Sequence, residues 1–263
     1  MQESHRLPTN KKLNTTLPSL TSHDSGQLNH LLICRSEECL WPSPYDADSP
    51  QAAFRFLTEC WWTLNEADQS IELVPAKPYV EALAHEWHGA FHRRQALLIE
   101  KSRRLIVSWI CRGLETWQMG LAFGESHIVD QTHENSAEHL WRIHFALSQL
   151  RERRPEFKLA KHEVRGSPAA KKATHVILPN GSLMTQGHQD AISEQGKGKT
   201  IVTLEEISKY RSPAAFWGQA LIVTQGAAGG QGGWVCGIAN ASPINEWQEI
   251  KGGASAREML GLE

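Results

Sequence analysis

The chain has 263 residues, a formal net charge of −2 and a sequence pI of about 6.7. This length suits one large α/β domain with extensions or two small domains, and the charge balance does not by itself predict nucleic-acid binding. No apolar run reaches the roughly 18 residues of a membrane-spanning helix, and the N-terminus lacks the pattern of a signal peptide. The cysteines are odd in number and form no C-x-x-C pair, which indicates reduced thiols.

Residues 1–50 are rich in Ser, Thr, Asn, Pro and His, a composition that predicts a polar, disordered tail or a loose strap. The composition changes near residue 51, and the segment 52–61 is predicted to form a short helix. A second helix is predicted from Tyr79 to about Arg94, because its apolar residues recur at helical spacing. These residues are Val80, Leu83, Ala84, Trp87 and Phe91.

The second helix contains several histidines in a short space. His85, Glu86 and His88 resemble the zinc motif H-E-x-x-H only superficially, since the second histidine comes one residue early. His88 and His92 are four residues apart and share a helix face, but two ligands are too few for a metal site without a third. A solvated helix face is the simpler interpretation.

The stretch 101–108 follows an apolar run at 96–99 with strand character and precedes an amphipathic helix at 110–121. A strand, a short basic loop and a helix start form the layout of a phosphate-binding loop, because helix N-termini attract anions. The pattern G-x-x-x-x-G-K-[ST] is matched only in part. No glycine lies between Lys101 and Trp109, Val107 stands where the lysine is usual, and Ser108 is in place. A strand-loop-helix corner with a solvated basic loop is the alternative.

A second strand-then-helix unit follows, which favours a parallel sheet covered by helices. The strand is predicted at 127–132, and Asn135 with Glu138 has the spacing of a capping box. The next segment, 151–172, holds eight basic residues against three glutamates, a local net charge of +5. It is predicted to be either a solvated face or a contact with a DNA backbone. Further on, Asn180-Gly181 predicts a type I′ hairpin between strands at 174–179 and 182–186.

The run 200–204 is rich in β-branched residues and leads directly into Glu205 and Glu206. In a nucleotide-binding sheet, acids at a strand end lie beside the phosphates, where one binds magnesium and the other deprotonates the attacking water. A strand leading into an acidic helix start is the alternative. A further strand is predicted at 220–224, ending at Thr224 before a glycine-rich loop. We expect Ile99, Leu204 and Val223 to lie on central strands.

These features stand in one order: the Lys-Ser-Arg-Arg loop with its Ser108, Leu178-Pro-Asn-Gly-Ser182, the Glu-Glu strand end and the Thr224-Gln-Gly end. Together they resemble the ATPase domain of a bacteriophage or prophage terminase large subunit, over about residues 52–250. The resemblance implies a three-layer α/β domain of P-loop NTPase type with a mainly parallel sheet. It also implies residues 1–50 as the tail, 51–250 as the ATPase domain and 251–263 as the start of a linker to an absent nuclease domain.

The resemblance implies roles for single residues. The stretch 101–108 matches a variant Walker A loop, in which Lys101, Ser102 and Arg103 contact ATP, Arg104 stabilises the γ-phosphate, and Ser108 binds Mg²⁺. Leu204-Glu205-Glu206 matches Walker B, with Glu205 as a second Mg²⁺ ligand and Glu206 as the catalytic base. Thr224 matches the motif that couples hydrolysis to movement, and Tyr79 lies where the family contacts adenine.

The sequence also departs from the family pattern. Ile106 replaces the loop glycine, Glu205 stands where most members have aspartate, and the chain ends at Glu263 without a nuclease domain. We therefore expect an ATP-hydrolysing packaging motor without endonuclease activity. The implied partners are double-stranded DNA, a portal or procapsid, a small terminase subunit and further copies in a ring, in the cytoplasm of a bacterial host. The alternative is a non-catalytic remnant that serves as a binding or assembly module.

Overall fold

The computed structural model describes residues 40–65, 67–101, 106–167, 172–189, 199–225, 233–241 and 245–251. All of them belong to one compact unit, which spans residues 33–263. Its helices are α1 (Pro50–Cys60), α2 (Pro78–Arg93), α3 (Val107–Leu121), α4 (His133–Arg153), α5 (Pro213–Gln225) and α6 (Asn245–Lys251), with short 3-10 helices η2 (Lys158–Lys161) and η4 (Ile207–Lys209). Its strands are β1 (Trp62–Leu64), β2 (Ile71–Leu73), β3 (Leu97–Lys101), β4 (Glu125–Asp130), β5 (Glu163–Ser167), β6 (Lys172–Ile177), β7 (Leu183–His188), β8 (Ile201–Glu205) and β9 (Trp234–Asn240).

A seven-stranded sheet in the order β3-β9-β8-β4-β7-β6-β5 organises the unit. Parallel pairing joins β3, β9, β8, β4 and β7 in that order. Next to β7, the strands β6 and β5 extend the sheet by antiparallel pairing. The predicted mainly parallel α/β sheet is thus confirmed. The two short strands β1 and β2 form a separate antiparallel pair.

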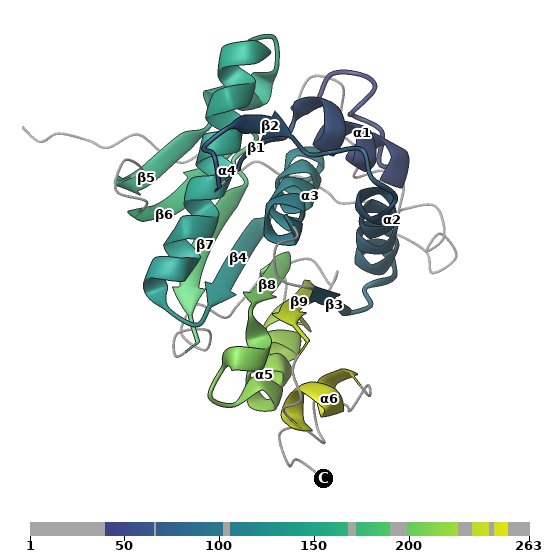
Figure 1. Cartoon of the computed structure of the whole chain (residues 1–263), viewed down its shortest axis with the longest axis vertical. Helices are drawn as coiled ribbons and strands as arrows, with labels where there is room; N and C mark the ends of the chain where they lie inside the picture. Colours follow the sequence, from purple (N-terminus) through teal and green to yellow (C-terminus); the bar gives the residue numbers. More distant parts are fainter. Residues whose placement is uncertain are drawn as a thin grey trace, which may run out of the picture. The chain divides into compact units, whose positions relative to one another are not determined.

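The sheet separates two hydrophobic clusters, because successive residues of a strand point to opposite faces. In β4, Ile128 packs in the cluster formed with α1 to α4, whereas Val129 packs in the cluster formed with α5 and α6. Figure 1 shows α5 and α6 beside β8 and β9, with α3 and α4 over the other face. The predicted three layers are present.

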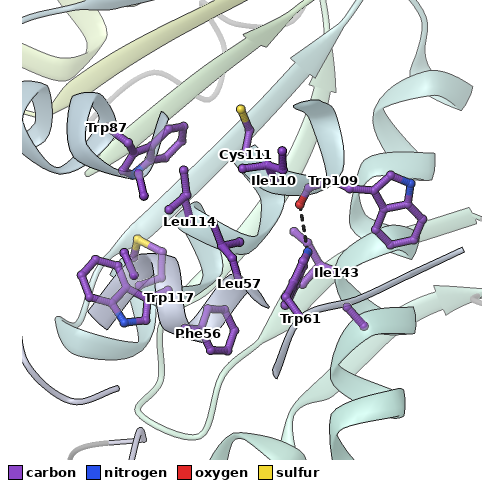
Figure 2. Packing of buried hydrophobic residues seen from close by; sticks show 14 of the residues in the cluster. Phe56, Leu57, Trp61, Trp87, Trp109, Ile110, Cys111, Leu114, Trp117 and Ile143 are labelled. Atoms are coloured by element: carbon purple, nitrogen blue, oxygen red, sulfur yellow. Dashed lines mark hydrogen bonds between the residues drawn. The ribbon is translucent and has the colours of Figure 1, made fainter. Parts of the chain in front are cut away.

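The larger cluster is rich in aromatic side chains. Trp61, Trp87 and Trp117 are fully buried, and the indole N–H of Trp61 donates to the carbonyl oxygen of Trp109 at 2.9 Å (Figure 2). Full burial of such a side chain contributes about 1.5–3 kcal/mol, and the indole hydrogen bond avoids the cost of an unpaired polar group. These residues hold α1, α2 and α3 together.

Residues 40–50, which the sequence placed in the tail, are packed against this cluster. Leu40, Trp41 and Tyr45 are buried, and the indole N–H of Trp41 donates to the carbonyl oxygen of Trp117 at 3.0 Å. Residues 40–50 thus pack with the folded unit, because a few large side chains anchor a segment that is polar on average. Residues 1–39 of the predicted tail and residues 252–263 lie outside the described residues.

Two turn predictions also need correction. The cap of α4 is Thr132, whose hydroxyl accepts from the backbone N–H of Asn135 at 3.2 Å, so Asn135 is inside the helix rather than at its cap. The hairpin between β6 and β7 forms as predicted, but only Gly181 has a positive φ, of 84°. A type I′ turn needs positive φ at both central residues. The turn is instead closed by a bond from the Gly181 N–H to the Leu178 carbonyl oxygen at 2.8 Å.

The predicted strand at 220–224 is wrong. These residues belong to α5, so Val223 lies on a helix, and the next strand of the sheet is β9. Ile99 does lie on a strand, but β3 stands at one end of the strand order rather than at its centre. Only Leu204, on β8, lies on an interior strand as predicted. Among the described residues, no helix is long and apolar enough to cross a membrane.

Candidate nucleotide site

The loop after β3 leads directly into α3, as the sequence predicts for a phosphate-binding corner. Lys101 is the last residue of β3, Ile106 precedes the first turn of α3, and no side chain caps that helix start. An uncapped start leaves backbone N–H groups available to an anion. Three further predicted ligands of ATP, Ser102, Arg103 and Arg104, lie outside the described residues.

Lys101, Ser108 and Glu205 converge from β3, α3 and β8. The ammonium group of Lys101 donates to Ser108 Oγ at 2.9 Å, and Ser108 Oγ in turn donates to Glu205 Oε2 at 3.3 Å. The Lys101 nitrogen also lies 3.9 Å from the same carboxylate oxygen. Glu205 and Ser108 are buried. The carboxyl ends of β3 and β8, which flank β9, and the start of α3 thus bring a cation, an acid and a hydroxyl to one edge of the sheet, which is where open α/β sheets bind ligands.

Glu206 completes this group from the turn after β8, where its φ of 52° lies in the left-handed region. One carboxylate oxygen lies 3.3 Å from the Lys101 nitrogen, and the other lies 3.0 Å from the Lys209 nitrogen. The side-chain amide of Asn240, at the end of β9, donates to Glu206 at 2.8 Å. Burial alone would raise the pKa of Glu206, but the hydrogen bond from Lys209 and the charge of Lys101 hold that pKa below its ordinary value. Glu206 is therefore ionised at neutral pH.

A second layer of buried charges lies behind Glu205, and sequence reasoning did not find it. Arg112 Nη2 lies 3.6 Å from Glu205 Oε1 and 3.1 Å from Glu115 Oε2, and neither Arg112 nor Glu115 is exposed to solvent. These are ion-pair distances without hydrogen-bond geometry. The helical spacing of 108, 112 and 115 was a usable signal, because it places Arg112 and Glu115 on the same face as Ser108.

His139 on α4 adds a neutral ring to this layer. Its Nε2 pairs with Asp130 Oδ2 at 3.1 Å, and its Nδ1 lies 3.9 Å from Glu205 Oε1. Burial lowers the pKa of His139 to about 3, although Glu205 opposes that shift. Burial also raises the pKa of Asp130, against hydrogen bonds from the backbone of Gln131 and from Asn135. These partners come from separate elements, so no local sequence pattern indicates that they meet.

Two predicted site residues are not part of this group. Thr224 lies near the end of α5, where its hydroxyl donates back into its own helix, to the Leu221 carbonyl oxygen at 2.9 Å. The prediction placed it at a strand end, and in the structure Asn240 holds the corresponding place at the end of β9. Tyr79 lies exposed in the first turn of α2 and takes part in none of the contacts that hold the group together.

The oxygen atoms of this group fit the ligand preference of Mg²⁺. Ser108 Oγ and Glu205 Oε2 are 3.3 Å apart, close to the roughly 3 Å between adjacent ligands of an octahedral ion with bonds of about 2.1 Å. Lys101 and the helix start would face the phosphates that usually accompany such an ion. The donor set is therefore compatible with a magnesium-bound nucleotide.

Comparison with known proteins gives structural matches but no sequence match. No family model and no curated protein matches the chain. The crystal structure of the HK97 bacteriophage large terminase matches with a TM-score of 0.57 and 12% sequence identity, over 78% of this chain and 42% of that chain. The large terminase ATPase domain of Thermus phage P74-26 is a weaker match, with a TM-score of 0.43 and 17% identity, over 67% of this chain and 74% of that one. The chain therefore has the fold of the HK97 large terminase, across a region that spans less than half of that protein.

Proposed function

We propose that this chain is the ATP-hydrolysing motor module of a phage DNA-packaging terminase large subunit. One observation carries the proposal: at the carboxyl ends of β3 and β8 and the start of α3, oxygen atoms of Ser108, Glu205 and Glu206 each lie within 3.9 Å of the Lys101 nitrogen. The fold shared with the HK97 large terminase supports it. In this proposal the region between residues 51 and 250 is the ATPase domain, and it works in the cytoplasm of a bacterial host.

The proposed mechanism gives each side chain a single task. Lys101 and the N–H groups at the start of α3 hold the phosphates of ATP, while Ser108 and Glu205 hold the Mg²⁺ that neutralises the developing charge. Ser102 and Arg103 contribute phosphate contacts, Arg104 stabilises the γ-phosphate, and Tyr79 contacts adenine.

Glu206 takes the proton of the attacking water as the oxygen of that water bonds to the γ-phosphorus. The bond to the β-phosphate oxygen breaks, and ADP and inorganic phosphate leave. Asn240 and Lys209 fix the orientation of the Glu206 carboxylate through contacts of 2.8 and 3.0 Å. An ionised carboxylate held in this way is ready to accept a proton.

In an assembled motor, we expect the module to act on double-stranded DNA together with a portal or procapsid, a small terminase subunit and further copies of itself in a ring. The basic segment 151–172 supplies the proposed DNA contact. Its described arginines and lysines are mostly exposed at the end of α4, on η2 and on β5.

A second candidate function, a non-catalytic binding or assembly module, is favoured by the loop itself. Ile106 replaces the loop glycine, and the ammonium group of Lys101 is already bonded to Ser108 and paired with Glu206. ATP binding would have to replace these contacts. The two candidates differ in one respect, since a remnant would release no phosphate from ATP.

The proposal is tested by titrating the protein with a fluorescent ATP analogue in Mg²⁺ and assaying phosphate release from ATP in parallel. Wild type should bind saturably and hydrolyse ATP, and Lys101→Ala should bind at least tenfold more weakly. Lys77→Ala is the matched control, because Lys77 is an exposed lysine that precedes α2. Binding without hydrolysis would favour the remnant. No saturable binding, or equal binding by Lys101→Ala, would exclude the proposed site.

A further inference from the structure

A group of three metal-binding side chains lies apart from the residues of the nucleotide site. Asp48 precedes α1, and His88 and His92 lie one turn apart on α2. One ligand atom from each side chain lies within 4.8 Å of the other two. The third ligand that the sequence did not supply therefore comes from Asp48, in the segment assigned to the tail. His85 and Glu86 of the superficial zinc motif are exposed and do not belong to this group.

The distances in this group are close to those of a tetrahedral metal site. Asp48 Oδ1 lies 3.1 Å from His88 Nε2 and 3.0 Å from His92 Nε2. Bonds of about 2.0–2.1 Å to a tetrahedral ion place adjacent ligand atoms about 3.4 Å apart. The two distances from Asp48 therefore lie within a few tenths of an ångström of the tetrahedral value, and the two histidine nitrogens lie within 4.8 Å of each other. The two imidazole rings, with centroids 4.3 Å apart, lie side by side.

The environment of Asp48 also suits a cation. Its side chain is 21% exposed and that of His88 is 19% exposed, so most water is excluded from both, whereas His92 is 42% exposed and leaves an approach from solvent. The carboxylate and the His88 ring are thus partly enclosed, and an ion can reach them from the His92 side.

We propose that Asp48, His88 and His92 bind a divalent transition-metal ion of the zinc class, with water as the fourth ligand. Two imidazoles and one carboxylate suit Zn²⁺, whereas Mg²⁺ and Ca²⁺ prefer oxygen ligands only. This inference is independent of the proposed ATPase function, because it uses none of the nucleotide-site residues.

The bound ion would join the segment before α1 to α2. That segment is already held to α3, because the indole N–H of Trp117 donates to the carbonyl oxygen of Tyr45 at 3.0 Å. Ser49, the residue after Asp48, caps α1 with its hydroxyl. A metal ligand at Asp48 would thus fix the start of α1 against α2, and it would stabilise the folded state because an unfolded chain does not hold the three ligands together.

The experiment is a Zn²⁺ titration of the full-length, chelator-treated protein under reducing conditions, using calorimetry and a competing chelator. We compare wild type with His92→Ala and Asp48→Asn. His85→Ala is the matched control, because it removes an exposed histidine from the same helix. Loss of groups that merely orient metal ligands costs about 10–100-fold in affinity, so loss of a ligand should cost at least tenfold.

Wild type and His85→Ala should each show one Zn²⁺ site and a higher melting temperature with Zn²⁺. His92→Ala and Asp48→Asn should lose that site, or bind at least tenfold more weakly, and lose the rise in melting temperature. Circular dichroism without metal identifies any variant that has not folded, and His88→Ala then replaces it. Absence of Zn²⁺ binding by wild type would overturn the proposal. Affinities within tenfold of wild type in the folded ligand variants would also overturn it.

Discussion

Replacing Arg112 with methionine should destabilise the protein severely. The guanidinium group is fully buried and lies 3.1 Å from a Glu115 oxygen and 3.6 Å from a Glu205 oxygen. Burial raises the pKa of Glu115, and the charge of Arg112 opposes that rise. Methionine preserves much of the apolar volume but removes the positive charge. Two buried carboxyl groups would then share a region with no guanidinium between them.

The size of the effect follows from this burial. Removing one partner of a buried ion pair costs about 3–5 kcal/mol, because the remaining charge is left uncompensated. A domain of this size loses roughly 2–4 °C in melting temperature for each kcal/mol, so we expect a decrease of roughly 6–20 °C. Urea unfolding followed by circular dichroism measures the free energy directly.

The control is Arg55→Met, which removes an exposed i,i+4 pair with Glu59. Such surface pairs contribute little to stability because solvent screens them, so the control should remain close to wild type. The double variant Arg112→Met/Glu115→Leu should recover a large part of the lost stability, because it also removes one buried acid. Equal stability of Arg112→Met and Arg55→Met would show that the buried ion pair does not stabilise the fold. No recovery in the double variant would show that Glu115 is not the group that Arg112 neutralises.

Two further predictions concern acid stability and DNA. Burial, assisted by the charge of Lys199, lowers the pKa of His127 to about 4. The unfolded chain therefore binds a proton that the folded protein does not between pH 6.5 and 4, and His127 should cost about 2 kcal/mol of stability between pH 7 and pH 5. His139, whose pKa burial also lowers, contributes a loss in both proteins. Urea unfolding should therefore show a loss that is about 2 kcal/mol smaller in His127→Gln than in wild type, and equal losses would contradict the assignment. If the basic segment contacts DNA, the variant Arg151→Ala/Lys161→Ala/Arg165→Ala should bind duplex DNA more weakly than wild type. Duplex DNA should also stimulate the ATPase activity of this variant less. The salt dependence should fall by about 0.9 in log–log slope for each lost phosphate contact, and an unchanged slope would exclude this segment.

The sequence predicted those parts of the fold that local patterns determine. Local patterns were sufficient to predict three helices, α2, α3 and α4, because each has apolar residues at helical spacing. They were also sufficient for the strands β3, β4 and β8, because each contains a short apolar run. The segment 213–225 was assigned partly to a strand because it is apolar on all sides, and periodicity cannot then distinguish a buried helix from a buried strand. β9 was missed because Gly237 and the glycines before it resemble a loop.

The candidate site was likewise predictable only where a local sequence pattern indicates a site residue. Ser108, Glu205 and Glu206 could be placed together because they follow a strand or open a helix, and the ends of parallel strands meet at one edge of the sheet. Asn240 and His139 could not be found in this way, since their partners come from elements far away in sequence. Asp48 could not be joined to His88 and His92 for the same reason, because 40 residues separate it from the first of them.

In the proposed mechanism, Glu206 removes the proton from water at a nucleotide site formed by β3, α3 and β8. Single-turnover release of phosphate from ATP in Mg²⁺, compared between wild type and Glu206→Gln, tests it most directly. The amide keeps the size of the side chain but cannot take the proton, so release should slow by about a hundredfold to ten-thousandfold while the affinity for the fluorescent ATP analogue stays close to that of wild type. Equal rates of phosphate release in the two proteins would contradict the claim.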